Sequence, residues 1–169
     1  MPTGPSSPES TVPHPLTHEE ERLWRSLQRL LMTLPRALDE DLLRSTGLSL
    51  TQYTVLMCLS EIPHNSMRMT ELASATALSA SRVTRAVEAM QARGLLSKRR
   101  HSTDARGNVV TITEAGRDRL RTAYPTHLAS ARARVLDYLD RTTVGDIAVQ
   151  LQAVAEPLCP TAQTPGVST

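Results

Sequence analysis

The stretch from residue 79 to residue 93 combines short hydroxyl side chains with guanidinium groups on one face of a predicted helix. An arginine can donate two hydrogen bonds to guanine O6 and N7, and serine or threonine hydroxyls can bond bases or phosphates. Val83, Val87 and Met90 recur at the spacing of a buried face and would anchor the helix. We predict that this helix enters a DNA major groove, with an ordinary amphipathic surface helix as the alternative. Its candidate DNA contacts are Ser79, Ser81, Arg82, Thr84 and Arg85.

The segment from Lys98 to Gly107 is a second candidate for DNA contact, because it is too polar to bury and contains a glycine. We predict a β-hairpin whose tip is tightened by Asp104, which can accept hydrogen bonds from backbone N–H groups. Arg106 would then point outward, and Arg99 is a further candidate contact. A protruding arginine suits the negative potential of a narrow minor groove. The alternative is a solvated turn with a local Asp–Arg pair.

Charge is distributed unevenly along the chain, although the formal net charge is only +2. Between Arg68 and Arg106 there are eight basic and three acidic residues, whereas the rest of the chain has 11 basic and 14 acidic residues. A basic middle between acidic flanks is typical of a phosphate-binding surface on a neutral scaffold. An unevenly charged but solvated surface is the alternative.

The periodicity of apolar residues predicts the elements that position these side chains. Two short helices joined by a tight turn and followed by a hairpin form a winged helix-turn-helix. The expected fold is mainly α with a small β-wing, in the order helix, helix, strand, helix, helix, hairpin, helix, helix. The predicted helices span residues 17–45, 49–61, 71–77, 79–93, 114–139 and 143–155, and the strands span residues 67–69, 95–99 and 108–113.

Capping patterns indicate where several helices begin and end. Thr17 and Ser49 are each followed three residues later by Glu or Gln, which is the pattern of a capping box. Thr70 and Ser79 are predicted to cap the third and fourth helices. Gly94 is expected to end the fourth helix in the left-handed conformation that favours glycine.

The outer helices carry apolar stripes, over residues 23–42 and 135–154, that one small winged module cannot cover. Exposed apolar surface costs about 25 cal/mol per Å², so we predict an isologous homodimer on a pseudo-palindromic site with half-sites roughly 10 bp apart. Pro35 and Pro125 are expected to bend the two long helices. The predicted organisation is a disordered arm (1–16), a helical dimerisation region (17–48 and 114–156), a DNA-binding domain (49–113) and a flexible tail (157–169).

Several other classes of function find no support in the sequence. There is no Gly-rich phosphate loop, nucleophile elbow or clustered carboxylate pair, so we do not expect an enzyme. The five histidines are scattered and none lies near a cysteine, so we expect no metal or other cofactor. No membrane span or signal peptide is recognised, and we expect a cytoplasmic, nucleoid-associated protein. Cys58 is interpreted as a buried thiol, with a redox sensor as the alternative.

Five short segments recur in a characteristic order and spacing: Met69–Ala73, Leu78–Arg85, Arg93–Leu96, Asp104–Gly107 and Thr111–Gly116. Together they resemble the MarR family of transcriptional regulators. The resemblance implies a triangular homodimer held by the first, fifth and sixth helices, a recognition helix over residues 79–93, and a wing motif at Asp104 and Arg106. It also implies a repressor that a small aromatic molecule or an oxidant releases from DNA.

The effector pocket implied by this resemblance would lie among the first, second and fifth helices. Its candidate walls are Trp24, Met32, Tyr53 and Met57, and Arg36 could meet an anionic effector. The alternative is that these are ordinary core residues. Three functions remain: a ligand-responsive repressor of a double-stranded DNA operator, a thiol-based redox regulator of the same fold, and a non-specific DNA-architectural module.

Overall fold

The computed structural model describes residues 14–100 and 108–158. The chain divides into two compact units, residues 1–33 and 34–169. The boundary falls within the first helix, α1 (His18–Thr46), and each unit is described by itself.

The smaller unit consists, in its described part, of the first turns of α1. The backbone N–H of Thr17 donates to Oε2 of Glu20 at 2.7 Å, and the N–H of Glu20 donates to Oγ1 of Thr17 at 3.2 Å. The predicted capping box is therefore confirmed. Apolar side chains on these turns, among them Leu23, Leu31 and Met32, are exposed in the single chain.

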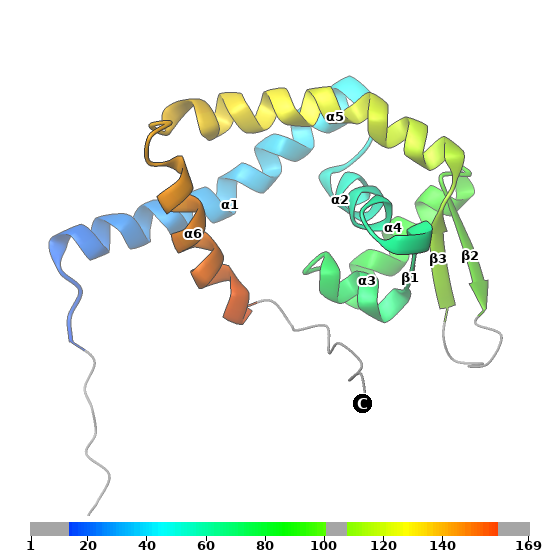
Figure 1. Ribbon diagram of the computed structural model, residues 1–169, viewed down its shortest axis with the longest axis horizontal. Coiled ribbons are helices and arrows are strands. Elements are labelled where there is room, and N and C mark those ends of the chain that lie inside the picture. Colours follow the sequence, from blue (N-terminus) through cyan, green and yellow to red (C-terminus); the bar gives the residue numbers. More distant parts are fainter. Residues whose placement is uncertain (1–13, 101–107, 159–169) are drawn as a thin grey trace, which may run out of the picture. The chain divides into compact units, whose positions relative to one another are not determined.

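The larger unit is a winged helix-turn-helix followed by two helices, so the predicted fold class is confirmed (Figure 1). Its three strands form an antiparallel sheet in the order β1-β3-β2. The strands are β1 (Ser66–Arg68), β2 (Leu96–Arg100) and β3 (Asn108–Ile112). The α-helices after α1 are α2 (Leu50–Ser60), α3 (Met69–Ala75), α4 (Ala80–Ala92), α5 (Glu114–Arg134) and α6 (Val144–Ala155). Short 3-10 turns cover Pro63–Asn65, Leu136–Tyr138 and Glu156–Leu158.

Strand β3 lies at the centre of the sheet, and its side chains alternate between buried and half-buried. Val110, which faces Met67 on β1 and Lys98 on β2, is fully buried, as is Ile112 apart from a small fraction. Val109 and Thr111 are only half-buried. Because successive side chains of a strand point to opposite faces, this pattern places one face of the sheet on the core.

The core of the larger unit is built from aliphatic side chains, as the shortage of aromatic residues requires. The largest of its fully buried side chains come from α1, α2, α3, α4 and β3, and the loop residue Leu48 joins them. Branched aliphatic side chains fill the space between helices in well-defined rotamers, which suits a bundle of short helices around a small sheet. These members are Leu42, Leu48, Val55, Leu56, Leu59, Leu72, Val83, Val87, Met90 and Val110.

Two predicted helix ends are wrong. Helix α3 begins at Met69 and not after Thr70, because the carboxylate of Glu71 accepts the backbone N–H of Arg68 at 2.9 Å and caps the helix two residues earlier. Helix α5 ends at Arg134 and not at Leu139. The apolar spacing continues past Arg134, but the backbone tightens there into a 3-10 turn.

Candidate nucleic-acid interface

Helix α4 presents a polar face that its buried face holds in place. Ser79 is the N-cap, as predicted, and its hydroxyl accepts the backbone N–H of Arg82 at 3.4 Å. The same hydroxyl lies 3.2 Å from that of Ser81. On the opposite side, Val83 and Val87 are fully buried in the core, so the polar face cannot rotate away from solvent.

The two arginines of this face are exposed and point in different directions. Nη2 of Arg82 lies 3.5 Å from the hydroxyl oxygen of Thr51 at the start of α2, whereas Nε of Arg85 donates to the carbonyl of Ser81 at 3.4 Å along its own helix. Neither guanidinium forms an ion pair with a carboxylate in the described part of the chain. Both are therefore available to a phosphate or to a base edge. Thr84 is half-buried beside them.

The turn between α3 and α4 has a backbone conformation that no sequence signal predicted. Ala77 has a φ of 52°, a left-handed backbone that costs a non-glycine residue roughly 1–2 kcal/mol. The backbone N–H of Leu78 donates to the carbonyl of Ala73 at 3.2 Å and closes the turn. A glycine or asparagine at position 77 would have been the usual signal, and neither is present.

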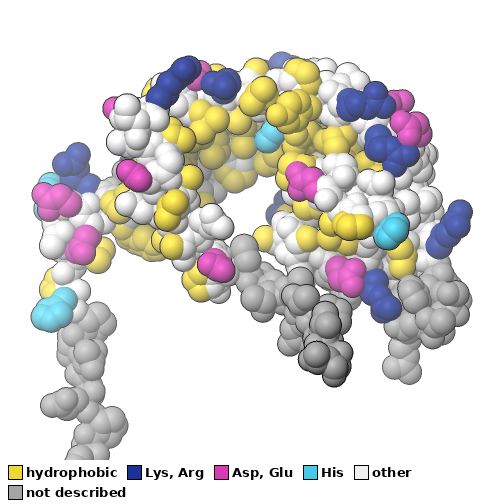
Figure 2. Space-filling model, viewed as in Figure 1, with side chains coloured by type: hydrophobic (Ala, Val, Ile, Leu, Met, Phe, Trp, Pro, Cys, Tyr) yellow, Lys and Arg dark blue, Asp and Glu magenta, His cyan; other side chains and the backbone are white. Residues whose placement is uncertain are grey.

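The wing is described only at its base. Arg99 is exposed on β2, opposite Val109 of β3, and Lys98 is half-buried. Figure 2 shows Lys and Arg side chains along the outer edge of the larger unit at β2. The predicted contacts Asp104 and Arg106 lie outside the described residues.

A tight junction joins the end of α4 to the start of α5. Gly94 has a φ of 71°, so the predicted left-handed glycine is confirmed. The hydroxyl of Thr113, the N-cap of α5, donates to the carbonyl of Gly94 at 2.7 Å and lies 2.9 Å from that of Leu95. Gly116, in the first turn of α5, packs so closely against Leu95 that a Cβ atom at position 116 would lie 2.2 Å from the carbonyl oxygen of Leu95. Helices α4 and α5 are thus connected almost without free space.

The five residues predicted for an effector pocket occupy different environments. Tyr53 is 2% exposed and belongs to the core, and Met57 packs against that core. Arg36 is exposed and pairs with Glu40, with Nε 2.9 Å from Oε1. Trp24 and Met32 belong to the smaller unit and are exposed. The role of these five residues as an effector pocket stays a prediction.

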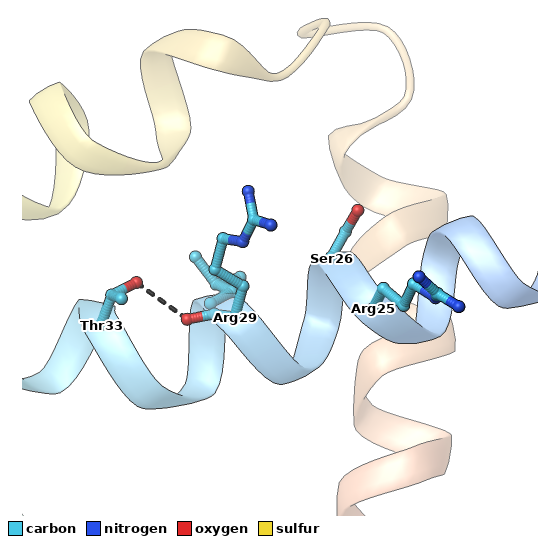
Figure 3. Close-up of a pocket in the computed structure, with 5 residues that line it drawn as sticks. Arg25, Ser26, Arg29 and Thr33 are labelled. Atoms are coloured by element: carbon cyan, nitrogen blue, oxygen red, sulfur yellow. Dashed lines mark hydrogen bonds between the residues drawn. The ribbon is translucent and has the colours of Figure 1, made fainter.

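The smaller unit has a surface hollow whose lining residues are sequence neighbours of Trp24 and Met32, the two residues of this unit predicted for the effector pocket. Neither Trp24 nor Met32 lines the hollow itself. All of its lining residues come from two turns of α1, which makes it an open surface feature. Figure 3 shows Thr33 donating to the carbonyl of Arg29, a bond of 2.8 Å. The lining residues are Arg25, Ser26, Arg29, Leu30 and Thr33.

Cys58 on α2 is half-buried and close to Glu61. Burial, with a contribution from the charge of Glu61, raises the pKa of this thiol above its ordinary value. Since the thiolate is the reactive form, the surroundings of Cys58 oppose oxidation.

The described residues offer neither a metal-binding cluster nor a membrane-spanning helix. No group of three or more His, Cys, Asp and Glu side chains lies close enough to hold a metal ion. Among the same residues, no helix is both long and apolar enough to cross a membrane.

The fold and the interface together define a winged helix-turn-helix protein of the DNA-binding kind. A sequence profile of the MarR family matches residues 46–107. The crystal structure of Sco3205, a MarR family transcriptional regulator from Streptomyces coelicolor in complex with DNA, is 31% identical, with a TM-score of 0.81 over 94% of this chain and 100% of that one. The chain belongs to the MarR family of transcriptional regulators.

Two further relatives agree with this assignment. AbsC, another MarR family regulator from Streptomyces coelicolor, is 32% identical, with a TM-score of 0.76 over 86% of this chain and 98% of that one. The HTH-type transcriptional repressor YetL of Bacillus subtilis is 28% identical over 94 residues, which are 56% of each chain. The match therefore spans just over half the length of this curated relative. The family consists of transcriptional regulators and not of enzymes.

Proposed function

We propose that the protein represses transcription by binding a pseudo-palindromic operator as a homodimer, and that a small molecule releases it. The observation that carries the proposal is the polar face of α4, on which Arg82 and Arg85 are exposed without a carboxylate partner in the described chain. No internal ion pair has to be broken before these guanidinium groups contact base edges. Its place of action is then the DNA itself, in the cytoplasm.

Homodimer formation is supported by apolar side chains that a single chain leaves in water. Leu23 and Leu31 on α1 are 71% and 64% exposed, and Leu151 and Val154 on α6 are 54% and 56% exposed. Figure 2 shows apolar side chains open on the surface over α5 and α6. A second copy is the occupant we propose, because two-fold symmetry lets one patch cover itself. A two-fold dimer in turn predicts two half-sites about one helical turn apart, roughly 10 bp.

Repression is supported by the relative YetL, which is a transcriptional repressor. A dimer that occupies an operator close to a promoter blocks the polymerase without needing any further surface. Activation would require an additional contact with the polymerase.

Release by an effector is supported by family membership and by one polar atom between α2 and α5. Nδ1 of His127 is buried and has no hydrogen-bond partner in the described part of the chain, and its ring lies against Tyr53. A small aromatic or anionic molecule that inserts between the rings of Tyr53 and His127 would form a hydrogen bond with Nδ1 of His127. It would thereby separate α2 from α5. Isothermal calorimetry with aromatic carboxylates, on wild-type protein and on His127→Ala, tests this step.

The redox alternative is disfavoured by the raised pKa of Cys58. Treatment with mild peroxide should leave the mass of Cys58 and the affinity for DNA unchanged. An oxidised Cys58 accompanied by loss of DNA binding would restore the redox regulator as the better proposal.

Selection of bound sequences from a random DNA pool tests the proposed function directly. We expect a two-fold symmetric motif, a preference over random DNA of roughly 10³-fold or more at physiological salt, and a complex that contains two protein chains per operator. Uniform recovery of the pool would favour the non-specific architectural module, and a single half-site bound by one chain would contradict the dimer.

A further inference from the structure

Helix α5 is held at both of its ends by side-chain hydrogen bonds to other elements. At its first turn, the hydroxyl of Thr113 bonds the carbonyl of Gly94, directly behind the recognition helix. At its last turn, Ser130 and Arg134 bond the carboxylate of Asp41 on α1. The helix between these ends is 21 residues long, or about 30 Å at a rise of 1.5 Å per residue. It therefore joins the recognition helix to α1 as a strut.

The bonds at the far end converge on one carboxylate. Nε of Arg134 donates to Oδ2 of Asp41 at 2.7 Å and Nη2 donates to Oδ1 at 2.9 Å, a two-pronged pair across 93 positions of sequence. The hydroxyl of the buried Ser130 donates to the same Oδ2, and Arg44 lies 3.6 Å from Oδ1. The side chain of Asp41 is only 17% exposed. We call Asp41, Ser130 and Arg134 the α1–α5 clamp.

The clamp differs from most ion pairs of the described chain. Arg25–Glu21, Arg36–Glu40 and Arg117–Glu114 each join neighbours on a single helix. Pairs of that kind typically contribute a few tenths of a kcal/mol and constrain nothing beyond their own helix. The planar fork of Arg134, by contrast, fixes both the distance and the orientation between two helices, because both of its hydrogen bonds must be kept at once.

We propose that the α1–α5 clamp sets the spacing at which the dimer reads its two half-sites. The inference rests on the proposed function, since it requires that α1 takes part in the dimer surface and that α4 reads DNA. Asp41, Ser130 and Arg134 are positioning residues in this scheme and do not touch DNA.

The length of the strut shows why a small change at the clamp matters. A swing of about 10° at one end of a helix of about 30 Å displaces the other end by about 5 Å. The rise of DNA is about 3.4 Å per base pair, so such a swing exceeds one step of operator spacing. While the Asp41–Arg134 hydrogen bonds are formed, the dimer favours one distance between half-sites. When they are broken, operators with neighbouring half-site distances become accessible at similar cost in free energy.

A library of operators with varied spacers tests the proposal on the full-length protein. Two copies of the half-site recovered with wild-type protein are placed on one duplex, and the spacer between them varies by single base pairs. We expect wild-type protein to prefer one spacing by about tenfold over its neighbours, and Asp41→Asn to reduce this ratio to about threefold or less. The base preference within each half-site and the dimer mass should remain as in wild type. Asp118→Asn is the matched control, since it breaks an ion pair with Arg121 within α5 itself and should keep the wild-type profile.

Arg134→Lys is the second variant, because it keeps the charge and loses the two-pronged geometry. Flattened spacing profiles in Asp41→Asn and Arg134→Lys with unchanged base preference support the clamp. An unchanged profile in either variant that still forms the dimer overturns it, and so does a wild-type protein that reads the half-site but is indifferent to spacing. Failure of wild-type protein to select any sequence would instead refute the proposed function itself.

Discussion

The phenol ring of Tyr53 on α2 lies against the imidazole ring of His127 on α5, with ring centroids 4.4 Å apart and planes inclined by 33°. Tyr53 is buried, and Nδ1 of His127 has no hydrogen-bond partner in the described chain. Burial lowers the pKa of His127 below its ordinary value of 6.5. The contact between the helix-turn-helix and α5 therefore depends on a neutral imidazole.

The first prediction is that the folded protein loses stability as the pH falls through 6.5. Because the pKa of His127 is lower in the folded state, the unfolded chain takes up the proton first, so this contribution to stability is complete above pH 6.5 and declines below it. Urea unfolding at pH 7.5 and 5.5 should show a smaller decline for His127→Gln than for wild type. Carboxyls with a lowered pKa, such as Asp41, lose their contribution only below about pH 4 and do not interfere. Equal declines in the two proteins would show that His127 does not titrate in this range.

The second prediction concerns the two exposed arginines of α4, the proposed recognition helix. Arg85→Ala should weaken operator binding by about 1–3 kcal/mol and relax the base preference at one position of each half-site, because a guanidinium that reads guanine is lost. Arg82 lies toward Thr51 on α2, and Arg82→Ala should lower the slope of log affinity against log salt by about one if that guanidinium meets a phosphate.

Binding titrations at several salt concentrations and repeated sequence selection distinguish the two arginines. Arg121→Ala is the matched control, because Arg121 is an exposed arginine on α5 that pairs with Asp118 and Glu114. If the Arg82 and Arg85 variants both bind and select as wild type does, the DNA-binding surface lies elsewhere on the molecule.

Most of the fold was predictable because local sequence signals and tertiary packing agree. The Ser49–Gln52 capping box, the Ser79 cap and the left-handed Gly94 are local patterns with one favourable backbone solution each, and all three are confirmed. The alternation along β3 was equally clear, since Val110 and Ile112 have only one face on which to be buried. These signals depend on a few neighbouring residues, which a sequence displays directly.

The errors arose where a distant or weak interaction decided the outcome. Thr70 looked like a helix cap, yet Glu71 reaches back to the N–H of Arg68 and starts α3 earlier. The approach of Arg82 to Thr51 and the pairing of Asp41 with Arg134 join residues 31 and 93 positions apart, and no periodicity encodes them. Long-range side-chain pairs require the packed arrangement of the helices to be known first.

The third prediction concerns the proposed dimer surface. Leu151→Asp places a charge on the apolar stripe of α6, where a second copy would have to bury it, so the dimer should dissociate and operator affinity should fall at least tenfold. Val149→Asp is the matched control, since Val149 is 68% exposed on the same helix but, two residues from Leu151, lies on the opposite face. Sedimentation equilibrium measures the mass of both variants. Dimers of equal strength in the two variants would remove α6 from the interface.

The fourth prediction concerns the junction behind the recognition helix. Gly116→Ala should destabilise the protein by about 2 kcal/mol or more, although alanine is favoured over glycine inside a helix by about 1 kcal/mol. The reason is steric: the added Cβ would lie 2.2 Å from the backbone carbonyl oxygen of Leu95 and 2.8 Å from a side-chain carbon of Ile112, and backbone cannot yield as a flexible side chain does.

Gly145→Ala provides the comparison for this substitution, because a Cβ at Gly145 in α6 meets nothing within 4 Å. It should be neutral or stabilising by up to about 1 kcal/mol. Thermal and urea unfolding measure both variants, and operator titration at a temperature where both are folded shows whether the forced separation of α5 from Leu95 also tilts α4. A Gly116→Ala variant as stable as Gly145→Ala would mean that α5 has room to shift, in which case the strut between the recognition helix and α1 is not rigid at its first turn.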